Sequence, residues 1–193
     1  MAAKVQPSSK ASCPPQAEWA TQYVVSALGI DPNKERPLYA ALQGVLLKGF
    51  PDGWSMQVDD KNRLFFWNTT SGESLWVHPD HETFKAVVEL QRLSHQQPSA
   101  CFFLRQVMEQ LEASFMLELS SWTGPYEVEN GHKYWHSESQ NASVWADPCV
   151  EVRRRHELRS GLVSACLLDA EQRAAKTTGA SFSSTNSRSS GSR

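Results

Sequence analysis

The stretch WSMQVDDKNRLFFWNTTSGESLWVHP, residues 54–79, decides the fold of this chain. Two turn-like segments, 59–62 (DDKN) and 70–73 (TSGE), separate three short runs of aromatic and β-favouring residues. Asp, Asn, Ser and Gly favour turns, whereas aromatic and β-branched side chains fit a pleated, half-buried surface. The pattern therefore predicts a small three-stranded antiparallel sheet.

A second copy of this pattern follows further along the chain. Three residues recur at offsets of 68, 69 and 69 positions, which is typical of a duplicated module: Trp54, Trp76 and Pro79 return as Trp122, Trp145 and Pro148. Asn130-Gly131 is a strong hairpin signal inside the second copy. The one-residue difference in offset predicts that the first hairpin of the second copy is one residue longer.

Amphipathic helical patterns flank both copies. Trp19, Tyr23 and Val24 share one helical face, Gly29 is placed to end that helix, and Asp31-Pro32 suits the start of a second one. The predicted class is α+β: two three-stranded antiparallel sheets, each embraced by helices, with disordered termini. The predicted order is 1–15 disordered, 16–50 helical pair, 51–80 first sheet, 81–118 helical linker, 119–149 second, degenerate sheet, 150–175 helix and 176–193 disordered tail.

Composition excludes several function classes. A net charge of −2 gives no electrostatic case for nucleic acid or an anionic membrane, and no run approaches 18 apolar residues. The four cysteines lie far apart, which favours reduced thiols in the cytoplasm or nucleus. The start of the chain lacks the apolar run of a secretory signal. No catalytic arrangement, metal-ligand spacing or phosphate-binding loop is present, so we expect no enzyme, cofactor or metal.

The spacing within residues 54–79 resembles that of the WW domain. Asn68 follows Trp54 by fourteen residues, Trp76 follows Asn68 by eight and Pro79 follows Trp76 by three, around the cluster Phe65-Phe66-Trp67. The second copy is similar but looser, because Ser137 stands where the family usually has Asn. The resemblance implies a module that holds a proline-containing segment of another protein.

Side chains alternate between the faces of a strand, so Phe65, Trp67 and Thr69 are expected on one face and Phe66 and Asn68 on the other. On the second face Trp54, Phe66 and Pro79 are expected to meet as a small hydrophobic buckle, and Asn68 to tie strand ends together through backbone hydrogen bonds. The structural counterparts in the second copy are Trp122, Trp135 and Pro148. Phe65 and Trp76, from neighbouring strands, are expected as two parallel, solvent-open ridges that receive a proline ring. The resemblance adds Ser74 as a hydrogen-bond donor and completes the peptide-binding set with Trp67, Thr69, Tyr134, His136, Ser143 and Trp145.

Departures from the family pattern bear on the ligand. Many WW domains that bind a proline-proline-x-tyrosine motif have His at the positions of Thr69 and Glu138, so tyrosine-ended ligands are disfavoured. The phosphoserine-binding subclass needs basic residues in the first loop, where Asp59-Asp60 is acidic. Lys61 and Arg63 keep that option open.

Residues 18–95 also resemble the N-terminal region of the large centrosomal protein of centriole distal appendages. The likeness rests on 29–32 (GIDP), Lys34-Glu35, Leu38 and Leu42, and on 76–80 (WVHPD). It implies a location at the centriole or basal body and a ciliary kinase as partner.

Two alternatives stay open. One is a nuclear, splicing-type tandem WW protein, disfavoured by the 42 residues between Pro79 and Trp122. The other is a structural assembly protein in which all aromatic side chains are internally buried.

Overall fold

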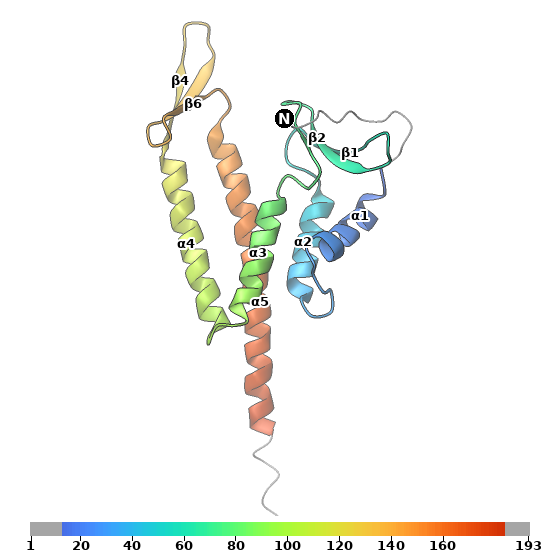
Figure 1. Ribbon diagram of the computed structural model, residues 1–193. Helices are drawn as coiled ribbons and strands as arrows, with labels where there is room; N and C mark the ends of the chain where they lie inside the picture. Colours follow the sequence, from blue (N-terminus) through green and yellow to red (C-terminus); the bar gives the residue numbers. More distant parts are fainter. Residues whose placement is uncertain (1–12, 184–193) are drawn as a thin grey trace, which may run out of the picture. The chain divides into compact units, whose positions relative to one another are not determined.

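The computed structural model describes residues 13–183, so the expected disorder at 1–12 and 184–193 lies outside the described residues. The chain forms two compact units that divide between Arg92 and Leu93. Each unit combines helices with one three-stranded antiparallel sheet (Figure 1), which confirms the predicted α+β class.

The first unit begins with three helical elements. They are α1 (Gln16–Gln22), a π-helical turn η1 (Tyr23–Ala27) and α2 (Arg36–Lys48). The π turn closes with the Leu28 N–H donating to the Tyr23 carbonyl at 3.2 Å, and Gly29 at φ 66° ends the helical stretch where the sequence predicts it.

Helix α2 starts later than Asp31-Pro32 suggests. The Asp31 carboxylate accepts the Asn33 N–H at 2.9 Å, while the Glu35 carboxylate accepts the Asp31 N–H at 2.9 Å. These bonds hold 31–35 as a turn, because Asp satisfies nearby backbone donors in turns as readily as at a helix start.

The first sheet consists of β1 (Trp54–Val58), β2 (Leu64–Asn68) and β3 (Ser74–Leu75), in that order. Helix α3 (His81–Ser94) follows. The core of the unit buries apolar side chains from the helices together with Phe66 of β2 and Phe84 of α3. Trp19 of α1 lies with its ring centroid 5.6 Å from that of Phe66, so the helices cover one face of this sheet.

The second unit is a pair of helices with the second sheet inserted between them in sequence. Helix α4 (Ala100–Ser120) leads into β4 (Trp122–Glu127), β5 (Lys133–Ser137) and β6 (Ala142–Val144), and α5 (Pro148–Ser183) returns alongside α4 (Figure 1). Leu104, Leu162 and Val163 are buried in the helix pair, and the rings of Phe115 and His156 stack at 4.1 Å.

Helix α5 continues to Ser183, past residue 176 where the sequence predicts an unstructured tail. None of the helices in the described part of the chain is long and apolar enough to cross a membrane.

Candidate functional site

Phe65 of β2 and Trp76, which directly follows β3, lie side by side on one face of the first sheet. Their ring centroids are 6.0 Å apart and the ring planes meet at 60°. The expectation of two open, parallel ridges is wrong for this pair, because Phe65 is 0% exposed while Trp76 is 50% exposed. The site is therefore one open indole ring supported along its edge by a buried phenyl ring.

Arg63 is a third member of this site. Its guanidinium carbon lies 4.6 Å from the centroid of the Trp76 ring, a cation–π contact. The Arg63 Nε and Nη2 donate to the Asp59 Oδ2 at 2.9 and 2.7 Å, so the guanidinium is fixed over the ring by a two-point ion pair. The sequence could have revealed this role, because residue 63 precedes Phe65 by two and so shares its face.

The Asp59 carboxylate organises the first loop. Its Oδ1 accepts the backbone N–H groups of Lys61 at 3.0 Å and Arg63 at 2.7 Å. Burial of the Asp59 carboxyl raises its pKa, but these bonds and the Arg63 guanidinium outweigh that effect and hold the pKa below its ordinary value. The acidic loop residue that disfavours phosphate thus positions a cation beside the open ring.

The other predicted groove residues of the first sheet have distinct settings. Trp67 and Ser74 pair across β2 and β3 and are half-buried. The Ser74 hydroxyl makes no hydrogen bond within residues 13–183, so it can donate to a ligand. Thr69 is exposed and its hydroxyl donates to the Gly53 carbonyl at 3.2 Å, so this predicted contact residue also ties the loop to the start of β1.

The opposite face carries the structural residues, with one change from the predicted buckle. Phe66 is 1% exposed, and its ring contacts come from Trp19, Phe50 and His78 at 5.6, 5.5 and 5.5 Å. Trp54 makes no ring contact in the part of the chain that is described; it and Pro79 are half-buried. Side chains outside the sheet thus supply the ring contacts of Phe66.

Asn68 holds the second loop of the first sheet. Its Oδ1 accepts the backbone N–H groups of Thr70 and Ser71, both at 2.9 Å. Its own N–H donates to the Glu73 carbonyl at 2.9 Å. This agrees with the structural role predicted for Asn68.

The second sheet repeats the register of the first with one irregularity. Trp122 pairs with Ser137 as Trp54 pairs with Asn68, but Gly124 and Pro125 together oppose Trp135. The first hairpin of the second sheet is thus one residue longer, as predicted, and the additional residue forms a β-bulge within β4. Gly124 is required there, because its φ is +133° and an added Cβ would lie 2.9 Å from the Tyr134 carbonyl oxygen.

A ring pair matching the first one lies on the second sheet. Tyr134 and Trp145 are 6.0 Å apart at 68°, Tyr126 adds a ring 5.4 Å from Tyr134, and Trp145 is 66% exposed. The His136 Nδ1 and the Ser143 Oγ are hydrogen-bonded at 3.0 Å. His132, at the repeat position of Arg63, lies 6.4 Å from Trp145 with its ring edge-on. The sequence did not indicate Tyr126, because the bulge shifts its alignment.

The opposite face of the second sheet is not sealed. Trp122, Trp135 and Pro148 are half-buried, and within residues 121–147 Ser137 is the single buried residue. Its hydroxyl accepts the Gln140 N–H at 3.4 Å, a weaker tie than that of Asn68. The expectation that helices embrace each sheet therefore describes the first sheet better than the second.

No three His, Cys, Asp or Glu side chains come together as a metal site in residues 13–183. Comparison with known proteins identifies one family: residues 50–79 match the model of the WW domain. No curated protein matches the chain.

Proposed function

We propose that this protein is a non-enzymatic adaptor that uses the WW domain at residues 50–79 to hold a proline-containing segment of another protein. A WW domain implies binding of proline-rich peptides in protein–protein interactions. The observation that carries the proposal is the half-exposed Trp76 ring, supported by Phe65 on the face that also presents the free Ser74 hydroxyl.

The geometry suits an extended ligand. A polyproline II segment leaves its carbonyl groups free and loses little conformational entropy on binding. A proline ring of the ligand packs on the open part of the Trp76 indole, and a ligand carbonyl accepts from Ser74. Since Arg63 covers part of the same indole, it lies at the edge of the bound segment.

The exposed fractions of Trp76 and Trp145 favour a binding protein over an assembly protein with all aromatic side chains buried. The ring pair Tyr134–Trp145 supports the proposal that the second sheet also binds a peptide, which makes the chain a two-site adaptor. Two sites on one ligand gain affinity through effective concentration when the spacer permits both to engage.

The test is a titration of the full chain with proline-rich peptides selected on an array. A single site of this size binds at roughly micromolar strength. We expect Trp76→Ala to weaken binding by about tenfold to a hundredfold, the range of a central aromatic contact, with an unchanged circular dichroism spectrum. Trp145→Ala is the matched variant on the second sheet. Unchanged affinity of the Trp76→Ala protein would refute this site.

We also propose a location at the centriole or basal body and a ciliary kinase as partner, on the resemblance of residues 18–95 stated above. The cytoplasm at large and the nucleus are the alternatives. Imaging of a tagged full chain decides between them: puncta at the base of cilia support the proposal, and diffuse nuclear signal contradicts it.

A further inference from the structure

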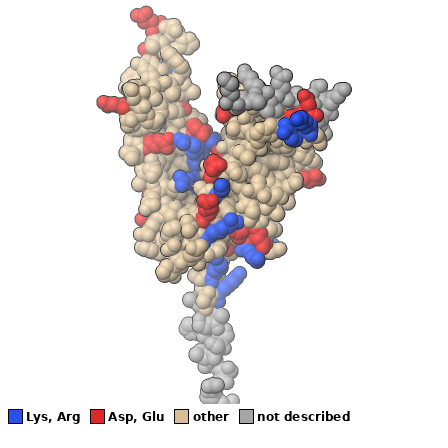
Figure 2. Space-filling view, viewed as in Figure 1, with Lys and Arg blue, Asp and Glu red and all other residues tan. Residues whose placement is uncertain are grey.

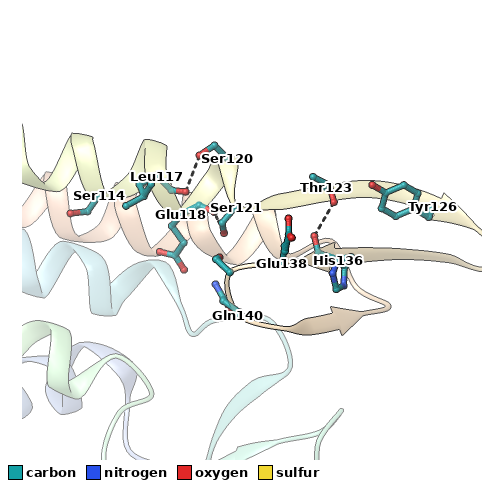
Figure 3. A pocket seen from close by; sticks show the side chains of 11 residues that line it. Ser114, Leu117, Glu118, Ser120, Ser121, Thr123, Tyr126, His136, Glu138 and Gln140 are labelled. Carbon is teal, nitrogen blue, oxygen red and sulfur yellow. Dashed lines mark hydrogen bonds between the residues drawn. The ribbon is translucent and has the colours of Figure 1, made fainter.

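A cleft of about 910 Å³ opens beside the ring pair of the second sheet, wholly within the second unit. The last turns of α4 form one wall through Ser114, Leu117 and Glu118 (Figure 3). The other wall consists of Thr123, Tyr126 and His136 of the sheet and of Glu138 in the loop after β5.

The cleft lies on the same sheet face as Tyr134 and Trp145. Cross-strand partners put their side chains on one face. Thr123 and Ser143 are both partners of His136, and Tyr126 is the partner of Tyr134. The exposed rings and the cleft are thus parts of one continuous surface, along which an extended peptide can pass from the rings into the cleft.

The charged side chains that line the cleft itself are all acidic. None of the eleven cleft residues is Lys or Arg, whereas Glu118 and Glu138 border the same space (Figure 3). Glu118 is paired with Arg155 of α5. Glu138 is exposed, and its carboxylate makes no hydrogen bond or ion pair within the described residues, so its charge is available to a ligand.

Residues 122–147 carry Glu127, Glu129, Glu138 and Asp147 against Lys133 alone, a net charge of −3. On the face shown in Figure 2, acidic side chains project from the end of the second unit that holds β4–β6. An acidic surface draws basic ligands and rejects acidic ones.

We infer that the second sheet binds a proline-containing segment that carries an Arg or Lys shortly beyond the proline. The proline packs on Trp145 and Tyr134, and the basic side chain enters the cleft and pairs with the Glu138 carboxylate. The inference extends the proposed function to the second sheet and assigns its ligand a charge. It differs from the first sheet, where Arg63 lies beside the exposed ring.

The experiment uses the full chain carrying Trp76→Ala, so that the WW domain does not contribute. Three synthetic proline-rich peptides differ only in one residue after the proline, which is Arg, Gln or Glu, and the series is repeated at successive positions. We expect the Arg peptide to bind about two- to fivefold more tightly than the Gln peptide, as for an exposed ion pair, and the Glu peptide to bind most weakly.

Glu138→Gln should remove the preference for Arg, and Glu138→Lys should reverse it in favour of Glu. The matched control is Glu129→Gln, which removes an acidic side chain of the loop between β4 and β5 that does not line the cleft. Added salt should reduce the preference.

Equal affinities for the three peptides, no binding of any of them, or an Arg preference that survives Glu138→Gln would overturn the inference. The proposed function is judged separately, by the loss of binding that Trp76→Ala causes in the otherwise unchanged chain. The inference about the second sheet and the proposed function of the first can therefore be refuted independently of each other.

Discussion

The two sheets share a register and a ring pair, yet one is sealed and the other is open. In the first, Phe66 is 1% exposed among the rings of Trp19, Phe50 and His78. In the second, the matching Trp135 is half-buried. The strand pattern is thus enough to form the candidate binding face. Side chains from outside the strands determine how deeply the opposite face is buried, and therefore how stable the sheet is.

The two exposed tryptophans, Trp76 and Trp145, show the same contrast. Arg63 stacks over Trp76 and is fixed by Asp59, whereas His132 meets Trp145 edge-on and Val128 stands at the position of Asp59. The buried aromatic layer around Phe66 and the Asp59–Arg63 ion pair beside the exposed ring are thus both features of the first sheet. Four experiments test this comparison.

The largest expected effect comes from the sealed face. Phe66→Ala should destabilise the first unit by about 3–5 kcal/mol, because it empties a packed aromatic site. Trp135→Ala should cost roughly half as much, since less apolar surface leaves a buried position. Denaturant unfolding with hydrogen exchange resolved by unit measures both. A cost for Trp135→Ala as large as that for Phe66→Ala would show that the second sheet is sealed in solution.

The bulge is a point where the second sheet alone can be disturbed. Gly124→Ala places a Cβ 2.9 Å from the Tyr134 carbonyl oxygen at a φ of +133°. We expect a loss of about 1–3 kcal/mol, as for strained backbone. Hydrogen exchange of β4–β6 should rise while that of β1–β3 stays unchanged. Unchanged exchange in β4–β6 would argue against the bulge.

A smaller difference is expected at the loop anchors. Asn68→Ala leaves two backbone N–H groups without their 2.9 Å acceptor and should cost about 1–2 kcal/mol. Ser137→Ala removes two weaker bonds, one to the Gln140 N–H at 3.4 Å and one to the Ser139 hydroxyl at 3.2 Å, and should cost about 0.5–1 kcal/mol. Ser137→Asn is the informative reverse variant. If Ser137→Asn stabilises the second sheet, an Asn at this position can hold the loop as Asn68 does in the first sheet. If it destabilises the sheet, the buried site is too small for the amide.

The smallest effect is a pH dependence confined to the first sheet. Because the folded-state pKa of Asp59 is lowered, its stabilising contribution is fully present above the ordinary Asp pKa of about 4 and is lost as pH falls below that value. Asp59→Asn should lower the urea midpoint at neutral pH, and the difference from wild type should vanish in acid.

Asp60→Asn is the control for that measurement, since Asp60 makes no hydrogen bond or ion pair within residues 13–183. The Asp59 variant should also make Trp76 more accessible to a quencher, because Arg63 is released from the ring. If the urea midpoints of wild type and Asp59→Asn differ by the same amount at every pH, the Asp59–Arg63 ion pair does not stabilise the first sheet.

Several features of the fold and the site could be predicted because they are local. The strands of the first sheet, the pairing of Phe65 with Trp76 and the anchoring role of Asn68 follow from alternation and turn chemistry within 26 residues. The recurring spacing extended the same reasoning to Tyr134 and Trp145. A period of two along a strand fixes which side chains share a face, whatever the rest of the chain does.

Other features depend on residues far apart in the sequence. Trp19 reaches Phe66 from a helix some 47 residues earlier, and the cleft beside β4 needs the end of α4. The sequence indicated one additional residue in the first hairpin of the second copy but not its place, since composition does not distinguish a longer loop from a bulge in a strand. The start of α2 was also misplaced, because Asp31 serves a turn as well as it serves a helix cap.

By itself, then, the sequence determined that there are two antiparallel sheets, which side chains share each face and which aromatic rings each sheet carries. These features follow from spacing along a single strand or hairpin. Only the tertiary structure decided that Phe65 is buried beside an open Trp76, that Arg63 lies over that ring, and that the second sheet borders an acidic cleft. Exposure and charge environment are sums over neighbours in space, and the spacing along one strand does not specify those neighbours.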